Sequence, residues 1–465
     1  GLEPSMAAAA AAAAAAMLSF VVAVLMMMIV LMIAMAILMR SRRKRNVIGF
    51  FHPYCNDGGG GERVLWCAIQ ALLREDSKRL IAVYTGDRAS KEEILAKAKE
   101  RFGFELHGER VQIVYISCRV LLEARMYPVL TLLGQSVGGA LLSIECLVRL
   151  NPGVFVDTMG GAFTYPVARF LFGCRVGCYV HYPTISCDML SLVSRREASY
   201  NNRRVISNSA LLSSLKLLYY KMFALVYGFC GRCAEVTMCN STWTKGHVQS
   251  IWKVLPDIVY PPCNTDKLQG IAFGGREDLV ISLGQFRPEK NHLLQLKSIQ
   301  HLLKLGVRDV HLAIIGSCRN AEDERRVRDL RQHVSDLELS DHVSVLTNVP
   351  WPELKDRWLR RAKAGLHTMW NEHFGINIVE FMASGVIPIA HDTGGPKADI
   401  VIPYQGSPTG FLASTEEEYA EHMRKVLGLP SSELAEIQGN ARNSVTRFSD
   451  EVFQQKFLLC IKRIL

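Results

Sequence analysis

Apolar runs alternate with amphipathic stretches along most of the chain after residue 45. The runs have the length and the turn-rich flanks of buried strands, and the stretches between them have helical spacing. Because a helix separates successive strands, this rhythm predicts parallel sheets covered by helices, a doubly wound α/β fold. The predicted strands cover residues 46–53, 80–85, 111–116, 154–157, 175–180, 279–283, 311–315, 343–346, 364–368 and 387–390.

The rhythm occurs twice, with a break at Val259-Tyr-Pro-Pro-Cys263. Proline pairs are poor inside regular elements and common in linkers. We therefore predict one domain over residues 46–258, a second over 259–447, and a terminal helix within 448–465. Other stretches with helical spacing are 63–73, 321–334, 351–363, 378–384 and 431–447.

The first 45 residues have a different pattern. Residues 1–5 precede the first methionine and are excluded from the fold, and residues 7–16 are an alanine run. Met17 to Met39 is uncharged, almost wholly apolar and long enough to cross a bilayer. Basic residues follow from Arg40 to Arg45, so the positive-inside rule predicts a cytosolic main body and a short N-terminus on the other side. A cleaved signal peptide carries its charges before the apolar core, so we interpret residues 1–45 as tail, membrane anchor and basic flank.

Two later segments are also rich in apolar residues. Residues 126–144 are uncharged, but Pro128 and several glycines make them too polar for a predicted span. Residues 211–229 carry a stripe of apolar side chains at helical spacing, interrupted by Lys216 and Lys221, which make a span costly. Two interpretations stay open: the stripe packs into the first domain's core, or it lies in the plane of a membrane surface.

Composition narrows the class of protein. A chain of 465 residues is long enough for two domains with sizeable cores. Its 13 cysteines have no regular spacing, which indicates reduced thiols; Cys230 and Cys233, with Cys239 nearby, lack the partners that would complete a metal site. The formal charge is +10, five of it within Arg40 to Arg45, and no RNA-binding motif accompanies it, so nucleic acid is not an expected partner.

The main candidate for chemistry is a pair of carboxylates in the second domain. Glu372 precedes a small turn, Phe374-Gly375-Ile376, and Glu380 lies about one turn into the helix that Gly385 ends. The first N–H groups of a helix suit a phosphate, and carboxylates accept hydrogen bonds from sugar and ribose hydroxyls. Two glutamates at this spacing also fit a solvated helix face, so the pair needs support from its surroundings.

Two cations supply part of that support. Arg287 and Lys290 follow the predicted strand 279–283. Ligands bind at the carboxyl ends of strands in open α/β sheets, and two cations there can neutralise a departing diphosphate. Surface charge is the alternative. No Asp-x-Asp metal clamp is present, and we predict neither a metal site nor a cofactor.

The first domain offers a glycine-rich loop and a histidine. Gly58 to Gly61 lie between the first predicted strand and a predicted helix, where glycine lets the backbone approach a phosphate or sugar. The spacing fits neither a dinucleotide-binding fingerprint nor a P-loop, and a plain flexible turn is the alternative. Tyr54 and Asp57 flank the loop as candidate acceptor contacts. His181 ends the strand 175–180, although a buried core histidine is the commoner role of a lone histidine.

Three motifs in this order resemble the family-four retaining glycosyltransferases, whose GT-B fold has two Rossmann-like domains facing a cleft. They are Ser282-Leu-Gly-Gln-Phe-Arg-Pro-Glu-Lys-Asn-His292, Trp370-Asn-Glu-His-Phe-Gly-Ile-Asn-Ile-Val-Glu380 and Thr393-Gly-Gly-Pro396. Residues 51–66, 181–183 and 369–376 are closer still to the branch that mannosylates dolichol-linked oligosaccharide for asparagine-linked glycosylation. The resemblance covers about residues 46–465.

The resemblance implies a role for each candidate residue. It makes the first domain acceptor-binding and the second donor-binding, with the terminal helix packed back toward the first. The implied catalytic residues are Glu372, His181, Arg287 and Lys290. The implied donor contacts are Arg287, Lys290, Phe374, Gly375, Ile376, Glu380, Gly59 and Gly60, and the acceptor contacts are Gly61, Tyr54 and Asp57.

The implied reaction is metal-independent, retaining transfer of two α-1,2-linked mannoses from GDP-mannose to Man(3)GlcNAc(2)-PP-dolichol. It would take place at the cytosolic face of the endoplasmic reticulum membrane, and a complex with other lipid-linked oligosaccharide mannosyltransferases is a further expectation. A lipid acceptor favours the membrane-surface interpretation of residues 211–229. The alternatives are another nucleotide-sugar GT-B enzyme of the same membrane pathway, a GT-B epimerase, or a non-catalytic nucleotide-sugar-binding scaffold, which the intact motifs disfavour.

Overall fold

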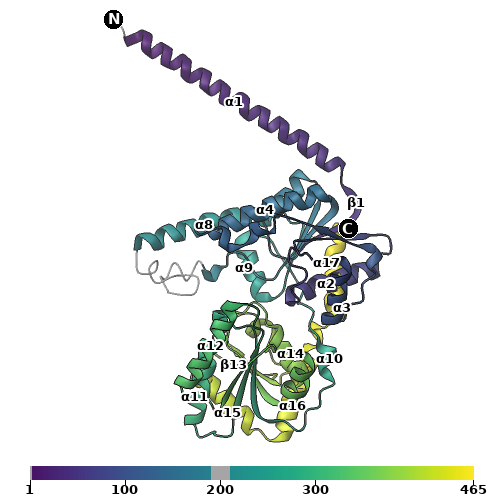
Figure 1. Ribbon diagram of the computed structural model, residues 1–465, viewed down its shortest axis with the longest axis vertical. Coiled ribbons are helices and arrows are strands. Elements are labelled where there is room, and N and C mark those ends of the chain that lie inside the picture. Colours follow the sequence, from purple (N-terminus) through teal and green to yellow (C-terminus); the bar gives the residue numbers. More distant parts are fainter. Residues whose placement is uncertain (1–2, 190–209) are drawn as a thin grey trace.

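Two parallel sheets organise the protein in the computed structural model, which describes residues 3–189 and 210–465 (Figure 1). The first sheet has strand order β3-β2-β1-β4-β5-β6-β7 and the second β10-β9-β8-β11-β12-β13. All described neighbours in both sheets are parallel, so the predicted doubly wound α/β class is confirmed. The strands of the first sheet are β1 Lys44–Phe51, β2 Leu80–Thr85, β3 Val111–Tyr115, β4 Pro152–Asp157, β5 Arg175–Val180, β6 Val236–Cys239 and β7 Asp257–Ile258. Those of the second are β8 Glu277–Leu283, β9 His311–Gly316, β10 Val343–Thr347, β11 Ala362–His367, β12 Ile387–His391 and β13 Phe411–Ala413.

Helices connect the strands and cover both faces of each sheet. Those before the linker are α1 Glu3–Ser41, α2 Gly60–Glu75, α3 Lys91–Phe102, α4 Thr131–Arg149, α5 Thr164–Pro166, the π-helical segment η4 Val167–Leu171, α8 Ala210–Gly231 and α9 Thr242–Trp252. Those after it are α10 Thr265–Gln269, the 3-10 segment η5 Pro288–Lys290, α11 His292–Lys304, α12 Ala321–Asp336, α13 Trp351–Glu353, the π-helical segment η6 Leu354–Leu359, α14 Ile376–Ser384, α15 Glu416–Gly428, α16 Ser431–Ser444 and α17 Asp450–Ile461.

The central strands are buried on both sides. In β1, Val47 and Phe51 belong to one hydrophobic core and Ile48 and Phe50 to another, because alternate side chains point to opposite faces of a sheet. A strand covered by helices on both faces therefore shows a continuous apolar run, which is the pattern that made it recognisable in the sequence.

The predicted helix over 351–363 is wrong at its C-terminal end. Helical structure ends with η6, and β11 begins at Ala362. Ala362 and Ala364 are fully buried and pair with β8, so the chain there follows the sheet. Alanine is a good helix former, and tertiary packing overrides that local preference here.

The chain returns to the first domain at its end. Phe453, Phe457 and Ile461 of α17 are buried in the core that contains α2, and α17 lies beside α2 in Figure 1. Arg63 of α2 donates to both carboxylate oxygens of Asp450 at 2.7 Å and to the Pro262 carbonyl at 3.0 Å. This buried guanidinium therefore connects the first domain, the linker and the terminal helix.

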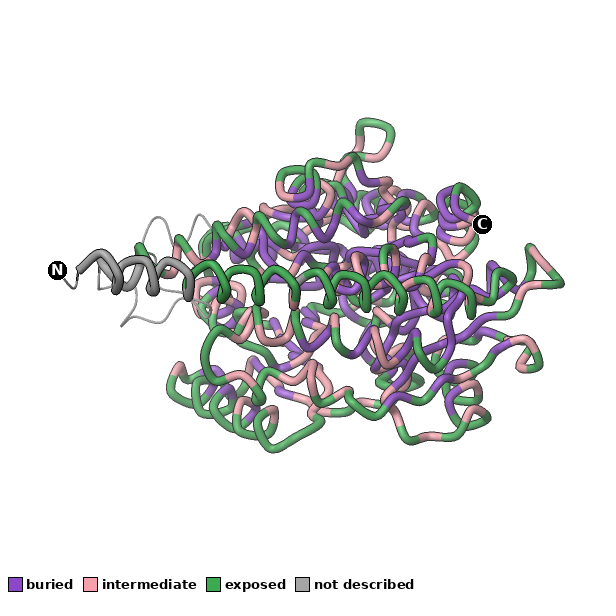
Figure 2. Tube along the Cα trace, turned by 90° about the horizontal axis from the view of Figure 1, so that it is seen from above, coloured by how far each residue is buried: buried purple, intermediate pink, exposed green. Residues whose placement is uncertain are grey.

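Two described helices have the length and composition of a membrane span. The first is Ala14–Ser41, the apolar part of α1; the described residues of α1 are exposed along almost all of its length (Figure 2). The second is α4, which is less apolar and one-third buried, as a core helix can be. The base of α1 is held to the first domain, because Asn151 donates to the Met39 carbonyl at 2.8 Å and Arg40 to the Phe170 carbonyl.

Helix α8 has two apolar faces. One face packs into the core through Tyr220, Phe223 and Tyr227. The stripe seen in the sequence is on the other face, and its side chains are 47–68% exposed: Leu215, Leu218, Met222, Leu225, Val226 and Phe229. The core interpretation of this stripe is therefore wrong for its described side chains; Leu211 lies outside them.

Candidate active site

The turn before α14 is shaped by one glycine and one aromatic residue. Gly375 caps the helix with φ +111°, and a Cβ there would lie 2.8 Å from Ile378, so the position requires glycine. Phe374 is buried, with its ring centroid 5.9 Å from that of Tyr260 and 5.3 Å from that of Phe448. The Phe374 side chain thus anchors the turn, and the N–H groups of Ile376 and Asn377, the first two of α14, have no acceptor inside the helix.

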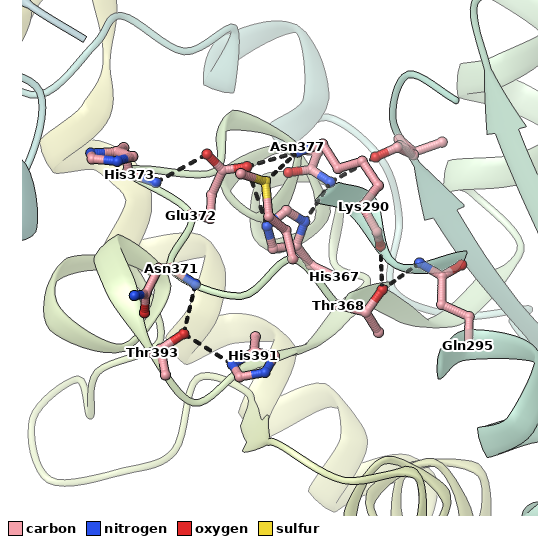
Figure 3. A network of polar contacts seen from close by, with 12 residues as sticks. Lys290, Gln295, His367, Thr368, Asn371, Glu372, His373, Asn377, His391 and Thr393 are labelled. Carbon is pink, nitrogen blue, oxygen red and sulfur yellow. Dashed lines mark hydrogen bonds and ion pairs between the residues drawn. The ribbon is translucent and has the colours of Figure 1, made fainter. Parts of the chain in front are cut away.

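Lys290 and Glu372 form the central ion pair of the site (Figure 3). Lys290 Nζ lies 2.7 Å from Glu372 Oε2, and the two side chains are 22% and 17% exposed. Burial alone would raise the pKa of Glu372, but Lys290 and His367 outweigh it and hold the pKa at about 2. Glu372 Oε1 accepts the His373 N–H at 3.1 Å, so both carboxylate oxygens are engaged.

A second layer of side chains fixes this pair. Thr368 Oγ1 donates to the Lys290 carbonyl at 2.7 Å and accepts from Gln295 at 2.9 Å. Burial and the neighbouring Lys290 lower the pKa of His367 to about 3, so this imidazole is neutral. The loops after β8 and β11 are therefore held together at the carboxyl ends of adjacent strands.

Arg287 does not join the pair. Its side chain is half exposed and lies 3.9 Å from Glu289 within the same loop. The sequence brought Arg287 and Lys290 together as two cations for one diphosphate, and the structure places only Lys290 at Glu372. The role of Arg287 stays a prediction.

Glu380 lies in α14, below the turn. Burial raises its pKa to about 7, and Arg63, which reaches toward it from α2, only partly offsets that effect. Within the described part of the chain, Glu380 has no hydrogen-bond or ion-pair partner. A half-buried carboxyl group without a partner is a candidate for binding a ligand that donates hydrogen bonds.

The glycine-rich loop faces this site from the first domain. The Gly59 N–H donates to Glu62 Oε2 at 2.8 Å, which caps α2. A Cβ on Gly60 would come within 2.9 Å of Ile376 in the second domain. The N-terminal ends of α2 and α14 therefore meet across the interdomain boundary, and both carry the partial positive charge of a helix start.

Two histidines border the space beside Gly61. A Cβ on Gly61 would lie 3.8 Å from His52 and 3.9 Å from His181 Nε2. Burial lowers the pKa of His181 to about 4 and that of His52 to about 3, so both are neutral. His181 Nε2 is buried and has no hydrogen-bond partner among the described residues.

His52 is fixed by a neighbour on the adjacent strand. His52 Nδ1 lies 2.7 Å from Thr158 Oγ1, and Thr158 Oγ1 donates to the Phe51 carbonyl at 3.5 Å. The short contact with Thr158 fixes the orientation of the His52 ring. β1 and β4 are the strands at which the order of the sheet reverses, the usual place for a ligand.

The candidate acceptor contacts are less defined. The Arg119 guanidinium lies 4.7 Å above the Tyr54 ring, and Asp57 is exposed at the rim of the loop. Their roles stay predictions.

The sequence reasoning did not identify His52, Thr158, His367 or Asn377, all of which line or support the site. Their position at the carboxyl ends of strands could have identified three of them. His52 and Thr158 directly follow β1 and β4, and His367 is the last residue of β11.

Within the described ranges, no group of three or more histidine, cysteine, aspartate or glutamate side chains has a metal-binding arrangement. Cys230 and Cys233 are buried free thiols.

Comparisons with known proteins cover both domains. Residues 45–252 match the family model described as ALG11 mannosyltransferase N-terminus, and residues 265–444 match that of glycosyl transferases group 1. The chain is 48% identical to the mouse GDP-Man:Man(3)GlcNAc(2)-PP-Dol alpha-1,2-mannosyltransferase, over 91% of this chain and 88% of that one. It is 46% identical to the human protein of the same name, with the same shares covered.

Solved structures match the fold. The crystal structure of Anabaena Alr3699/HepE in complex with UDP and glucose has a TM-score of 0.59 at 14% identity, over 90% of this chain and 99% of that one. Sucrose-phosphate synthase from Thermosynechococcus elongatus has a TM-score of 0.64 at 14% identity over the same shares. The expected GT-B fold is confirmed.

The Lys290–Glu372 pair should contribute to stability without any ligand. We expect Lys290→Met to lower the free energy of unfolding by about 1–3 kcal/mol, because it leaves a largely buried carboxylate without its cation. Glu372→Gln in the same chain should restore part of the loss. Chemical denaturation at pH 7 measures both. Lys297→Met is the matched control, since its partner Glu416 lies 3.8 Å away at the surface, and it should cost about 0.5 kcal/mol or less.

The effect of Lys290→Met should also depend on pH. The low pKa of Glu372 contributes stability that is present above the pKa of an unfolded glutamate, about 4.3, and is lost as pH falls toward about 2. The difference between Lys290→Met and the parent should therefore shrink in that window. A loss equal to that of Lys297→Met at pH 7 would contradict a stabilising pair.

Proposed function

The chain belongs to the ALG11 mannosyltransferase family, and from this membership we propose that it transfers mannose from GDP-mannose to Man(3)GlcNAc(2)-PP-dolichol. Two α-1,2 linkages are made in turn, with retention of configuration. The single observation in the structure that supports this best is the Lys290–Glu372 pair. It lies at the carboxyl ends of β8 and β11, beside the helix start that faces the glycine-rich loop.

The diphosphate of the donor binds at the cationic side of the cleft. Lys290 and the N–H groups at the start of α14 stabilise the negative charge that grows on the leaving diphosphate, and Arg287 turns inward to join them. Glu380 accepts hydrogen bonds from the ribose hydroxyls, and Glu372 accepts them from hydroxyls of the mannose. Two observations support these assignments: the carboxyl group of Glu380 has no partner among the described residues, and the low pKa of Glu372 keeps it ionised at neutral pH.

The acceptor hydroxyl attacks on the face from which the diphosphate leaves. A double displacement would need a carboxylate nucleophile beneath the anomeric carbon. Glu372 is a poor candidate, because in the proposed donor complex its oxygens accept hydrogen bonds from the mannose hydroxyls and the His373 N–H. The leaving diphosphate takes the acceptor proton, a bond forms between acceptor oxygen and anomeric carbon, and the bond to the diphosphate breaks. His181 lines the anomeric region from the first domain, next to Gly61.

The protein is attached to the membrane of the endoplasmic reticulum. The apolar part of α1 crosses the bilayer, with the short N-terminus in the lumen and both domains in the cytosol, in accordance with the basic flank Arg40 to Arg45. The exposed stripe of α8 lies in the membrane surface. The exposed Leu133, Val137 and Leu141 of α4 extend it, since Tyr219 of α8 accepts the Leu133 N–H at 3.1 Å. A complex with other mannosyltransferases of the pathway stays a prediction.

Purified protein with labelled GDP-mannose and a lipid-linked trimannosyl acceptor tests the proposed reaction. We expect mannosylated lipid, and the activity should persist in EDTA because the diphosphate charge is met by Lys290, Arg287 and a helix start. Release of free mannose without lipid product would indicate an epimerase or hydrolase, and binding without turnover a scaffold. Loss of activity in EDTA that Mg²⁺ or Mn²⁺ restores would contradict the electrostatic assignment.

Substitution of Glu380 and substitution of Glu372 should change different kinetic parameters. Glu380→Ala should mainly raise KM for GDP-mannose and Kd for GDP, because a ribose contact is made equally in ground and transition states. Glu372→Ala should mainly lower kcat, because it holds the reacting sugar. Steady-state kinetics and calorimetry with GDP measure the difference, and equal losses in both parameters for both variants would contradict the division.

The pH dependence of GDP affinity should follow Glu380. The ribose hydroxyls donate more strongly to the ionised carboxylate than to the neutral acid, and the pKa of Glu380 in the free protein is about 7, so affinity should fall as pH drops below about 7. In Glu380→Gln this dependence between pH 6 and 8 should be lost.

The exposed stripe of α8 should bind lipid without α1. A chain starting at Lys44 should float with liposomes, and Leu218→Ser with Leu225→Ser should weaken binding by about tenfold or more, since two buried leucine side chains are removed from the interface. Leu459→Ser is the control, because Leu459 is also 74% exposed but belongs to α17, which packs into the other core of the first domain. A folded, GDP-binding chain that stays wholly in the soluble fraction would contradict the membrane-surface interpretation.

A further inference from the structure

His367 is held in one orientation and one tautomer. It is 2% exposed, and its carbonyl accepts the Tyr419 hydroxyl at 2.9 Å. Asn377 Nδ2 donates to the Leu283 carbonyl at 2.8 Å, which fixes the amide, and it lies 3.3 Å from His367 Nδ1. An NH₂ group can only donate, so Nδ1 is the acceptor and the proton of the neutral ring is on Nε2.

The protonated nitrogen points at Glu372 but has no hydrogen bond. His367 Nε2 lies 3.5 Å from Glu372 Oε2, longer than a good N–H to oxygen bond, and among the described residues it has no other partner. The same oxygen is occupied by Lys290 Nζ at 2.7 Å (Figure 3). A buried N–H without an acceptor is unusual and calls for a reason.

Lys290 is needed in two places. In the free protein its ammonium holds Glu372, and in the donor complex the same ammonium meets the diphosphate. A lysine side chain is flexible and can turn, whereas His367 is fixed at the end of β11 by Asn377 and Tyr419. If Lys290 moves toward the diphosphate, the Nε2–H of His367, 3.5 Å away, is the described donor that remains beside Glu372 Oε2.

We propose that His367 is a positioning residue, which takes over Glu372 Oε2 when Lys290 turns to the diphosphate and so keeps Glu372 aimed at the mannose. This proposal rests on the proposed function. It accounts for the unpaired Nε2–H in the free protein, because the hydrogen bond forms only in the donor complex. A neutral donor suits the task, since it orients the carboxylate without removing the charge that the sugar hydroxyls contact.

The test compares three variants of the full chain. His367→Leu removes the donor and should lower kcat by about tenfold or more while Kd for GDP stays within about twofold. His367→Gln restores an N–H near the position of Nε2 and should recover kcat to within about threefold of the parent. His311→Gln is the control, a part-buried histidine that bonds Ser344 at 2.7 Å at the other end of the same sheet, and should leave kcat unchanged.

Asn377→Leu keeps the imidazole but frees its Nδ1, so it reports on the tautomer even if His367→Leu does not fold. The proton can then occupy Nδ1 and leave a lone pair facing Glu372, so kcat should fall with Kd for GDP unchanged. Equal losses in kcat and GDP affinity, no rescue by glutamine, or full activity in Asn377→Leu would overturn the proposal. An inactive parent protein would instead contradict the proposed function.

Discussion

The ion pair between Lys290 and Glu372 is the interaction on which the geometry of the cleft depends. It joins the loops that leave two adjacent parallel strands, and Thr368 joins them a second time through the Lys290 carbonyl. With Glu372 fixed, only three residues separate it from α14, and two of them, Phe374 and Gly375, set the direction of that helix. The start of α14 and the carboxylate therefore hold a constant relation to each other, as a site for a charged sugar donor requires.

The same arrangement is mirrored by the first domain. α2 also starts at the carboxyl end of a strand, and its glycine-rich N-terminus reaches Ile376 of α14. A Cβ on Gly60 would come within 2.9 Å of the end of the Ile376 side chain, so the two helix starts lie close together. Arg63, one turn further along α2, bonds the linker and α17, so the contact between domains is stabilised from both sides of the cleft. An anion bound between two helix starts would be stabilised by both dipoles.

The sequence predicted the longer strands and the architecture of the two domains because each has a local signal, but it did not predict β7 and β13, which have only two and three residues. A strand buried on both faces is a continuous apolar run, and a helix start after a turn needs glycine. The sequence did not predict His52 or His367, because each sits at the end of an apolar run and resembles part of it. The sequence left two interpretations of the α8 stripe open for a related reason: a helix with two apolar faces has no single polar side, so periodicity alone cannot say which face is buried.

Burial shifts the pKa values of the ionisable groups in the cleft in opposite directions for histidines and glutamates. It lowers the pKa values of His52, His181 and His367, and it would raise those of both glutamates. Lys290 reverses the effect at Glu372 but lies too far from Glu380 to do so there. In the proposed reaction, the groups beside the reacting sugar therefore keep one charge state around neutral pH, with neutral histidines and an ionised Glu372. Glu380, proposed to bind the ribose, changes its charge near pH 7. Under this proposal, pH acts on nucleotide binding and not on the charges at the reacting sugar.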